Sequence, residues 1–103
     1  MKIGSFSGRG DYDASKPIVF DISIPDGGHI ADANISLGHK TAQLHLRVVH
    51  DVSDEIVPMK MIALLNGQEH ADAHESEFVQ RTRAHKFTSA VAPYYLFVVP
   101  RGE

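Results

Sequence analysis

The feature that most constrains the fold of this chain is the strict alternation of apolar and polar residues in two of its segments. Residues 16–25 read KPIVFDISIP, and residues 42–50 read AQLHLRVVH. Successive side chains of a β-strand point to opposite faces, so a period of two places one face against a core and the other in water. Both segments are therefore predicted to be half-buried strands.

The rest of the chain is typical of further strands separated by turns. The apolar run at residues 56–65 favours a strand buried on both faces over a short helix, because it is too continuous to leave one face in water. Residues 29–37 suit a weaker strand or a loop, and residues 68–77 suit a polar loop or one or two helical turns. Residues 93–100 (PYYLFVVP) are predicted as a strand with proline at both limits.

Six to seven short strands, with no amphipathic helix long enough to form a crossover, predict an all-β fold. An antiparallel two-sheet sandwich, immunoglobulin-like or jelly-roll, is the expected architecture. The length of 103 residues with 43% hydrophobic residues fits one domain that spans residues 1–103. The serine-rich and glycine-rich residues 4–16 are expected to form an N-terminal loop or arm.

Composition and charge limit the classes of partner and of chemistry. The formal net charge of −3 disfavours nucleic acid and membrane surfaces as partners. The chain has no cysteine, so disulfides, thiolate metal sites and cysteine nucleophiles are excluded. Its start carries no apolar run of the kind found in secretory signals, so we expect cytoplasmic synthesis.

One short motif suggests adhesion. Arg9, Gly10 and Asp11, within SGRGDYD, form the tripeptide that animal cell-surface receptors bind. A glycine-rich segment is typical of an exposed loop, where such a receptor could reach it. A solvated loop without any receptor explains the same residues more simply. Asp11 and Asp13 also offer oxygen ligands for calcium, and a second acidic turn adds Asp51, Asp54 and Glu55. The helix-loop-helix calcium pattern is absent, so acidic turns that stay in water are the alternative.

A basic stripe is predicted near the C-terminus. Arg81, Arg83 and His85 recur at intervals of two, so a strand would align them on one face with Lys86 beside them. The stripe could bind a phosphate or an acidic surface, including the acidic residues within 69–77 of a neighbouring copy. The simpler interpretation is a charged edge strand, because edge charges deter unwanted sheet addition.

Histidines provide the candidate metal ligands, since the chain has seven. His70 and His74 are spaced i, i+4 and would share one face of a helix, with Glu77 about one turn further. No H-E-x-x-H pattern accompanies them, and a solvated polar loop is the alternative.

The function favoured by these observations is not enzymatic. The chain has no G-x-S-x-G nucleophile motif, no phosphate-binding loop and no dinucleotide fingerprint, so no cofactor is expected. We expect a structural or binding module that acts through protein–protein contacts, as a homo-oligomer or as a subunit of a larger assembly such as a virion or a decorated particle. The alternatives are a small metal-dependent enzyme or metal-binding protein that uses histidines, and a calcium-dependent or RGD-type adhesion domain.

Overall fold

The computed structural model describes residues 1–87 and 89–99 and shows an all-β chain. Its strands are β1 (Lys2–Asp11), β2 (Ile18–Pro25), β3 (His29–Leu37), β4 (Thr41–His50), β5 (Ile56–Leu64), β6 (Phe78–Lys86) and β7 (Ser89–Val99). One short 3-10 turn, η1 (Glu75–Glu77), precedes β6, and the described residues contain no α-helix. The all-β class and the seven strands agree with the prediction.

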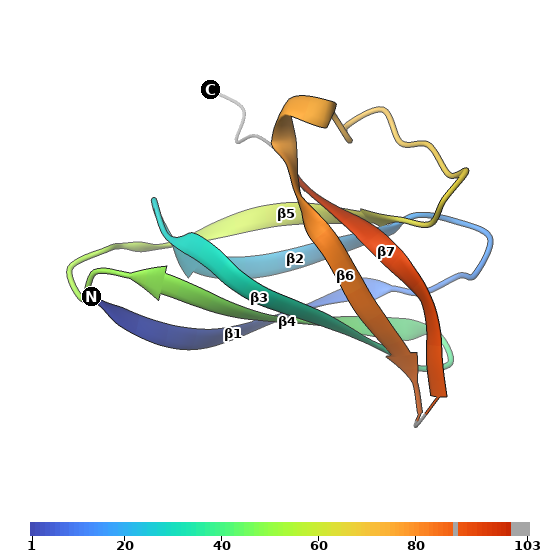
Figure 1. The fold of residues 1–103 in the computed structure, drawn as a ribbon, viewed down its shortest axis with the longest axis horizontal. Coiled ribbons are helices and arrows are strands. Elements are labelled where there is room, and N and C mark those ends of the chain that lie inside the picture. The colour runs from blue at the N-terminus through green and yellow to red at the C-terminus, as the bar shows by residue number, and fades with distance from the viewer. Residues whose placement is uncertain (88, 100–103) are drawn as a thin grey trace.

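The strands form one closed ring and not plainly the two separate sheets of the predicted sandwich (Figure 1). The order is β1-β2-β5-β7-β6-β3-β4, and β4 returns to pair with β1. Neighbours are antiparallel except for β3 and β6, which pair in parallel. The barrel is flattened, with extents of 39 × 32 × 20 Å. The prediction of an entirely antiparallel sandwich is corrected on both points.

Two glycines of β1 allow the ring to close. A Cβ atom added to Gly8 would lie 2.5 Å from the carbonyl oxygen of Asp21, and one added to Gly10 would lie closer still to the carbonyl oxygen of Val19. The backbones of β1 and β2 therefore meet where neither glycine has room for a side chain. Residues 4–16 were expected to form a loop, but residues 4–11 belong to β1.

The interior of the barrel is filled by buried side chains from β2 to β7, and Phe6 of β1 packs against them. Phe20, Leu44 and Leu96 have no exposed surface, and the ring of Tyr94 is almost fully buried. The remaining core consists mainly of aliphatic residues: Ile18, Ile22, Ile24, Ala33, Ile35, Leu37, Ala42, Leu46, Val48, Met61, Ala63 and Ala84. Burial raises the pKa of the Tyr94 hydroxyl to about 12, with a smaller contribution from the charge of Tyr12. The alternation seen in the sequence is thus the alternation between this core and the outside.

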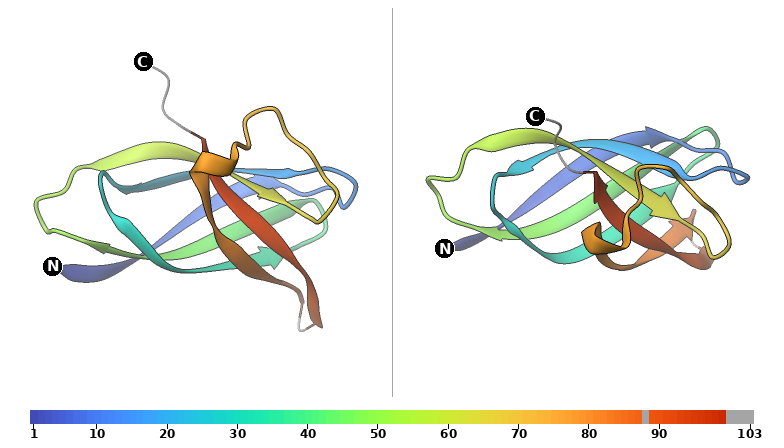
Figure 2. Two further views of the ribbon diagram at one scale, coloured as in Figure 1. Left: turned by 45° about the horizontal axis from the view of Figure 1, so that its top comes forward. Right: turned by 90° about the horizontal axis from the view of Figure 1, so that it is seen from above.

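The outer face of β5 is covered by the connection to η1. Ile62 and Leu64 alternate with the core residues Met61 and Ala63, yet all four are buried. Leu64 lines a hollow together with five residues of this connection, and Figure 2 shows the connection passing over the end of β5; the five residues are Gln68, Glu69, His70, Ala71 and Ala73. The predicted strand with two buried faces is therefore confirmed for the second half of β5.

Other boundaries differ from the sequence-based expectation in detail. Residues 29–37 form the full strand β3. β7 begins at Ser89, and Pro93 lies inside it, where the pairing with β6 is irregular between Thr82 and Ala84. Because proline has no backbone N–H to donate, it is tolerated inside a strand at such an irregularity of the ladder. Within the described residues no helix is long and apolar enough to cross a membrane.

Candidate functional site

Polar and cationic side chains gather on the outer surface of four neighbouring strands, β1, β4, β3 and β6. They alternate along each strand with residues that face the interior. We call this surface the arginine face, and its residues are Ser5, Ser7, Arg9, Asp32, Asn34, Ser36, Gln43, His45, Arg47, Arg81, Arg83 and His85.

The strand register arranges these side chains in rows. Arg9 lies opposite Gln43, Gln43 opposite Ser36, and Ser36 opposite His85. The next row runs in the same way from Ser7 through His45 and Asn34 to Arg83. Because neighbouring strands lie about 4.8 Å apart, each row places polar groups at short, regular intervals. The face is therefore a grid of hydrogen-bonding and charged groups.

Positive charge dominates the grid. Every arginine within the described residues is on it, and Arg9, Arg47, Arg81 and Arg83 are all exposed. Asp32, opposite Arg47, is the one acid among the residues of the face as defined here. The only ion pair within 4.0 Å in residues 1–87 and 89–99 joins the N-terminus to Asp51, so these guanidinium groups remain available to an external anion. A local cationic surface thus exists on a chain whose net charge is negative.

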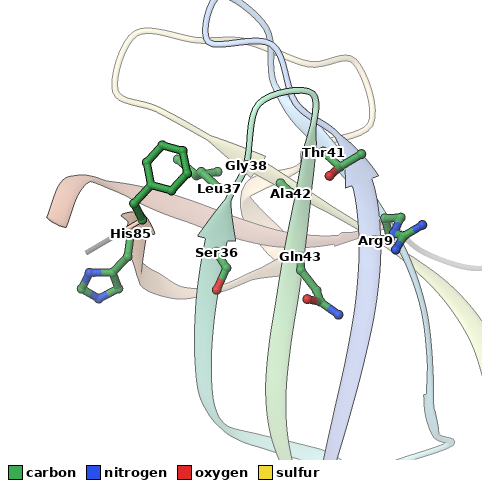
Figure 3. Close-up of a pocket in the computed structure, with 9 residues that line it drawn as sticks. Arg9, Ser36, Leu37, Gly38, Thr41, Ala42, Gln43 and His85 are labelled. Carbon is green, nitrogen blue, oxygen red and sulfur yellow. The ribbon is translucent and has the colours of Figure 1, made fainter. Parts of the chain in front are cut away.

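Two hollows lie on this face and meet at His85. The first, of about 370 Å³, is lined in part by Arg9, Ser36, Gln43 and His85. Figure 3 shows Arg9 and His85 on its two sides, with the side chains from β3 and β4 between them. The second, of about 330 Å³, is lined by Arg81, Arg83 and His85 together with Ala90, Val91 and Pro93. Both can accept an anionic group, because each contains cationic side chains in the open.

An unusual residue marks the turn between β6 and β7. Phe87 has a φ of 57°, a conformation that bulky residues rarely adopt, and 73% of its surface is exposed. Its ring packs edge-to-face against His39, with 6.0 Å between the ring centroids. An exposed aromatic side chain therefore stands at the end of the arginine face, on a turn that a glycine would fit more easily.

The predicted stripe of Arg81, Arg83 and His85 is confirmed as one face of a strand. The edge-strand interpretation is wrong for its second half, because β6 pairs with β3 along residues 83–86 as well as with β7. Lys86 does not belong to the stripe. It points the other way, and its ammonium group lies 5.7 Å from the centroid of the Tyr12 ring.

The residues of the RGD tripeptide lie in a strand and not in a loop. Arg9 and Asp11 are exposed, Gly10 is buried against β2, and all three pair with β4. The backbone is thus fixed in a ladder, so the exposed loop on which the adhesion hypothesis depends does not form.

Asp13, in the following turn, accepts hydrogen bonds from the backbone and hydroxyl of Ser15, at 3.0 and 2.7 Å. These bonds lower the pKa of the Asp13 carboxyl group and occupy one of its oxygens.

The proposed metal ligands His70, His74 and Glu77 do not share a helical face. Only Glu75–Glu77 forms a helical turn, and both histidines precede it. His70 instead accepts a hydrogen bond at its Nδ1 from the backbone N–H of Asp72, at 3.0 Å. Among the residues with described positions, no three histidine, aspartate or glutamate side chains come together as a metal site would require. The i, i+4 spacing was misleading because the segment is not helical.

Sequence reasoning missed the contribution of β3 and β4 to the site. The alternation in residues 42–50 had placed His45 and Arg47 on the polar face of a strand, but it does not reveal which strands are neighbours. Comparisons of the chain with protein-family models, with curated proteins and with solved structures found no match. The geometry of the arginine face therefore carries the functional conclusion.

Proposed function

We propose that this protein is a non-catalytic binding module that contacts an acidic surface of a partner protein through its arginine face. The observation that carries the proposal is the placement of Arg9, Arg47, Arg81 and Arg83 on one outer surface of adjacent strands. Arginine is enriched at protein interfaces, and its planar guanidinium group matches the geometry of a carboxylate with two hydrogen bonds.

The chemistry of the face favours a protein partner over nucleic acid. The net charge of −3 opposes the approach of a long polyanion, whereas a limited acidic patch can meet the local positive charge. Phe87, at the end of the face, is the single exposed aromatic residue that lines its first hollow, whereas single strands are usually held by several aromatic side chains on which successive bases stack. Binding is favoured over catalysis because the cationic groups are solvent-exposed. The polar atoms found buried without a partner, His50 Nε2 and Thr82 Oγ1, belong to buried residues and not to the exposed face.

A second copy of the chain is one possible form of such a partner. Glu69, Asp72, Glu75 and Glu77 lie on and beside the connection that covers β5, which is across the ring from β3 and β4. Copies joined from this acidic segment to the arginine face would use two different surfaces, an arrangement that produces rings or filaments. A homo-oligomer or a particle subunit would be built in this way.

The test measures binding of a fluorescently labelled oligo-glutamate peptide and of a single-stranded DNA of equal length. The variant Arg47→Glu/Arg83→Glu should weaken peptide binding by about tenfold or more, and added salt should weaken it further. Lys60→Glu, an exposed change on β5 outside the face, should leave the affinity within about twofold. Equal binding by all three proteins would contradict the proposal, and preference for DNA would replace it with a nucleic-acid function.

Sedimentation of the protein alone shows whether a second copy is the partner. Salt-sensitive oligomers that the same arginine variant abolishes would identify self-association as the form that the binding takes. A monomer that still binds the oligo-glutamate peptide would assign the arginine face to a different protein.

A further inference from the structure

One edge of the barrel wall is not covered by another strand. β7 pairs with β6 on one side, where Ser89, Ala90 and Val91 lie opposite Lys86, His85 and Ala84. On its other side β5 pairs with β7 only from Tyr95 to Val99. In the described part of the chain no strand pairs with the outer edge of residues 89–93, and Figure 1 shows this arm of the β6–β7 hairpin extending away from β5.

This edge lacks the protection that exposed edges usually carry. Proteins blunt a free edge with charged side chains, proline or a cover, because unpaired N–H and C=O groups are a template for another strand. Residues 89–92 read SAVA, and all of them are exposed and uncharged. Pro93 follows this segment and ends it. We call residues 89–92 the β7 edge.

The strand beside the β7 edge carries the basic stripe. Arg81, Arg83 and His85 line the hollow of about 330 Å³ together with Ala90 and Val91 of the edge itself. Ala90 lies directly opposite His85, and its methyl group leaves the space above β7 open. An added strand would lie about 4.8 Å beyond β7, within reach of arginine side chains that extend across the small residues. The position next to the edge is therefore suited to alternating carboxylates.

We propose that an extended acidic segment of the partner protein pairs with the β7 edge as an additional strand, with alternate carboxylates directed toward Arg81, Arg83 and His85. Backbone hydrogen bonds would supply affinity, and the basic stripe would select the sequence. The acidic chemistry of the partner rests on the proposed function, whereas the strand pairing is an independent claim. Two copies of the β7 edge would bring two basic stripes toward each other, so like-charge repulsion disfavours a second copy as the occupant.

The test uses a peptide of about eight residues that alternates threonine and glutamate, because threonine favours strands and glutamate supplies the carboxylates. Three control peptides separate the interactions. One alternates threonine and lysine. The other two have the threonine–glutamate sequence of the parent peptide and are N-methylated either at the even or at the odd positions. N-methylation removes backbone donors along one edge and leaves the charge unchanged. We expect one N-methylated peptide to bind about tenfold more weakly than the parent peptide, and the lysine peptide not to bind.

The protein side of the test is amide hydrogen exchange and one variant. The parent peptide should slow exchange of at least one backbone amide in residues 89–92 by about tenfold, and Arg81→Glu/Arg83→Glu should remove both the protection and the binding. Thermal unfolding of the variant confirms that it folds, and Lys60→Glu, an exposed change on β5 outside the arginine face, should retain the protection.

The outcomes separate the two proposals. Equal affinity of the parent and both N-methylated peptides, without protection of residues 89–92, would refute strand pairing, and the proposed function would stand if binding still required the arginines. An affinity for the parent peptide that Arg81→Glu/Arg83→Glu leaves unchanged would refute the role of the basic stripe. Slow amide exchange in residues 89–92 without any peptide, together with a doubled mass in sedimentation, would overturn the inference and identify a second copy as the occupant of the β7 edge.

Discussion

Replacing Gly10 with alanine tests the closure of the barrel between β1 and β2. The new Cβ atom would overlap the carbonyl oxygen of Val19 and lie 3.2 Å from Cγ2 of Ile18. The overlapped oxygen belongs to the backbone of β2, which is fixed by its ladder with β5 along its whole length. No rotation of a side chain can relieve that contact, so β1 must move away from β2.

The expected loss of stability follows from this contact. Overpacking of a tight site costs about 1–3 kcal/mol, and the displacement of β1 also exposes apolar surface of β2, so we expect a total of about 2–4 kcal/mol. In a domain of this size that corresponds to a melting temperature lower by roughly 10–20 °C. Thermal unfolding followed by circular dichroism measures it.

The matched control is Gly67→Ala. Gly67 has a φ of 92° and no atom within 4 Å of an added Cβ, so this change isolates the conformational cost of alanine, about 1 kcal/mol. Gly10→Ala should therefore lower the melting temperature well beyond the control. A melting temperature of Gly10→Ala within about 2 °C of the unaltered protein would show that β1 does not pack against β2, and the closed ring would be refuted.

Three further predictions concern burial. Thr82→Val should stabilise the protein by about 1 kcal/mol in urea unfolding, because Thr82 Oγ1 is buried without a partner; a lower urea midpoint would mean that the hydroxyl is paired. The pKa of Tyr94 is raised from 10.0 to about 12, so the unfolded chain ionises first, and stability that is complete below about pH 10 should fall by up to about 2 kcal/mol as the pH approaches 12. Tyr94→Phe should lose this part of the alkaline decline, and an unchanged decline would assign it to other groups. Ile62→Ala should cost about 2–4 kcal/mol in urea unfolding and Ile56→Ala less than about 1 kcal/mol, since Ile62 is buried and Ile56 is half exposed; equal losses would mean that the outer face of β5 is uncovered.

The strands were predictable wherever burial leaves a period of two in the sequence. Residues 16–25 and 42–50 alternate because one side of β2 and of β4 faces the core, and the structure reproduces that alternation. β1 escaped prediction because its inner positions include Gly8 and Gly10, which carry no apolar side chain to mark the buried face. The need for glycine there arises from the approach of β2, a contact that local sequence does not encode.

The same distinction applies to the site. The row of Arg81, Arg83 and His85 was predictable because it lies on one strand, where spacing alone decides which side chains share a face. The same rule places Lys86, the next residue of the strand, on the opposite face. Arg9 and Arg47 join the row only through pairing of β6 with β3 and of β4 with β1. Register between strands distant in the chain decides that neighbourhood, and it is not visible in the alternation.

The central claim is that the arginine face of this barrel is the surface that binds an acidic partner. The most direct measurement is an NMR titration of the unaltered protein with the oligo-glutamate peptide, recording which backbone amides shift. We expect the largest shifts in a continuous patch on β1, β4, β3 and β6 that includes Arg9, His45 and Arg83. Shifts confined to the outer surface of β2 and β5, or no shifts at peptide concentrations that saturate fluorescence binding, would contradict the claim.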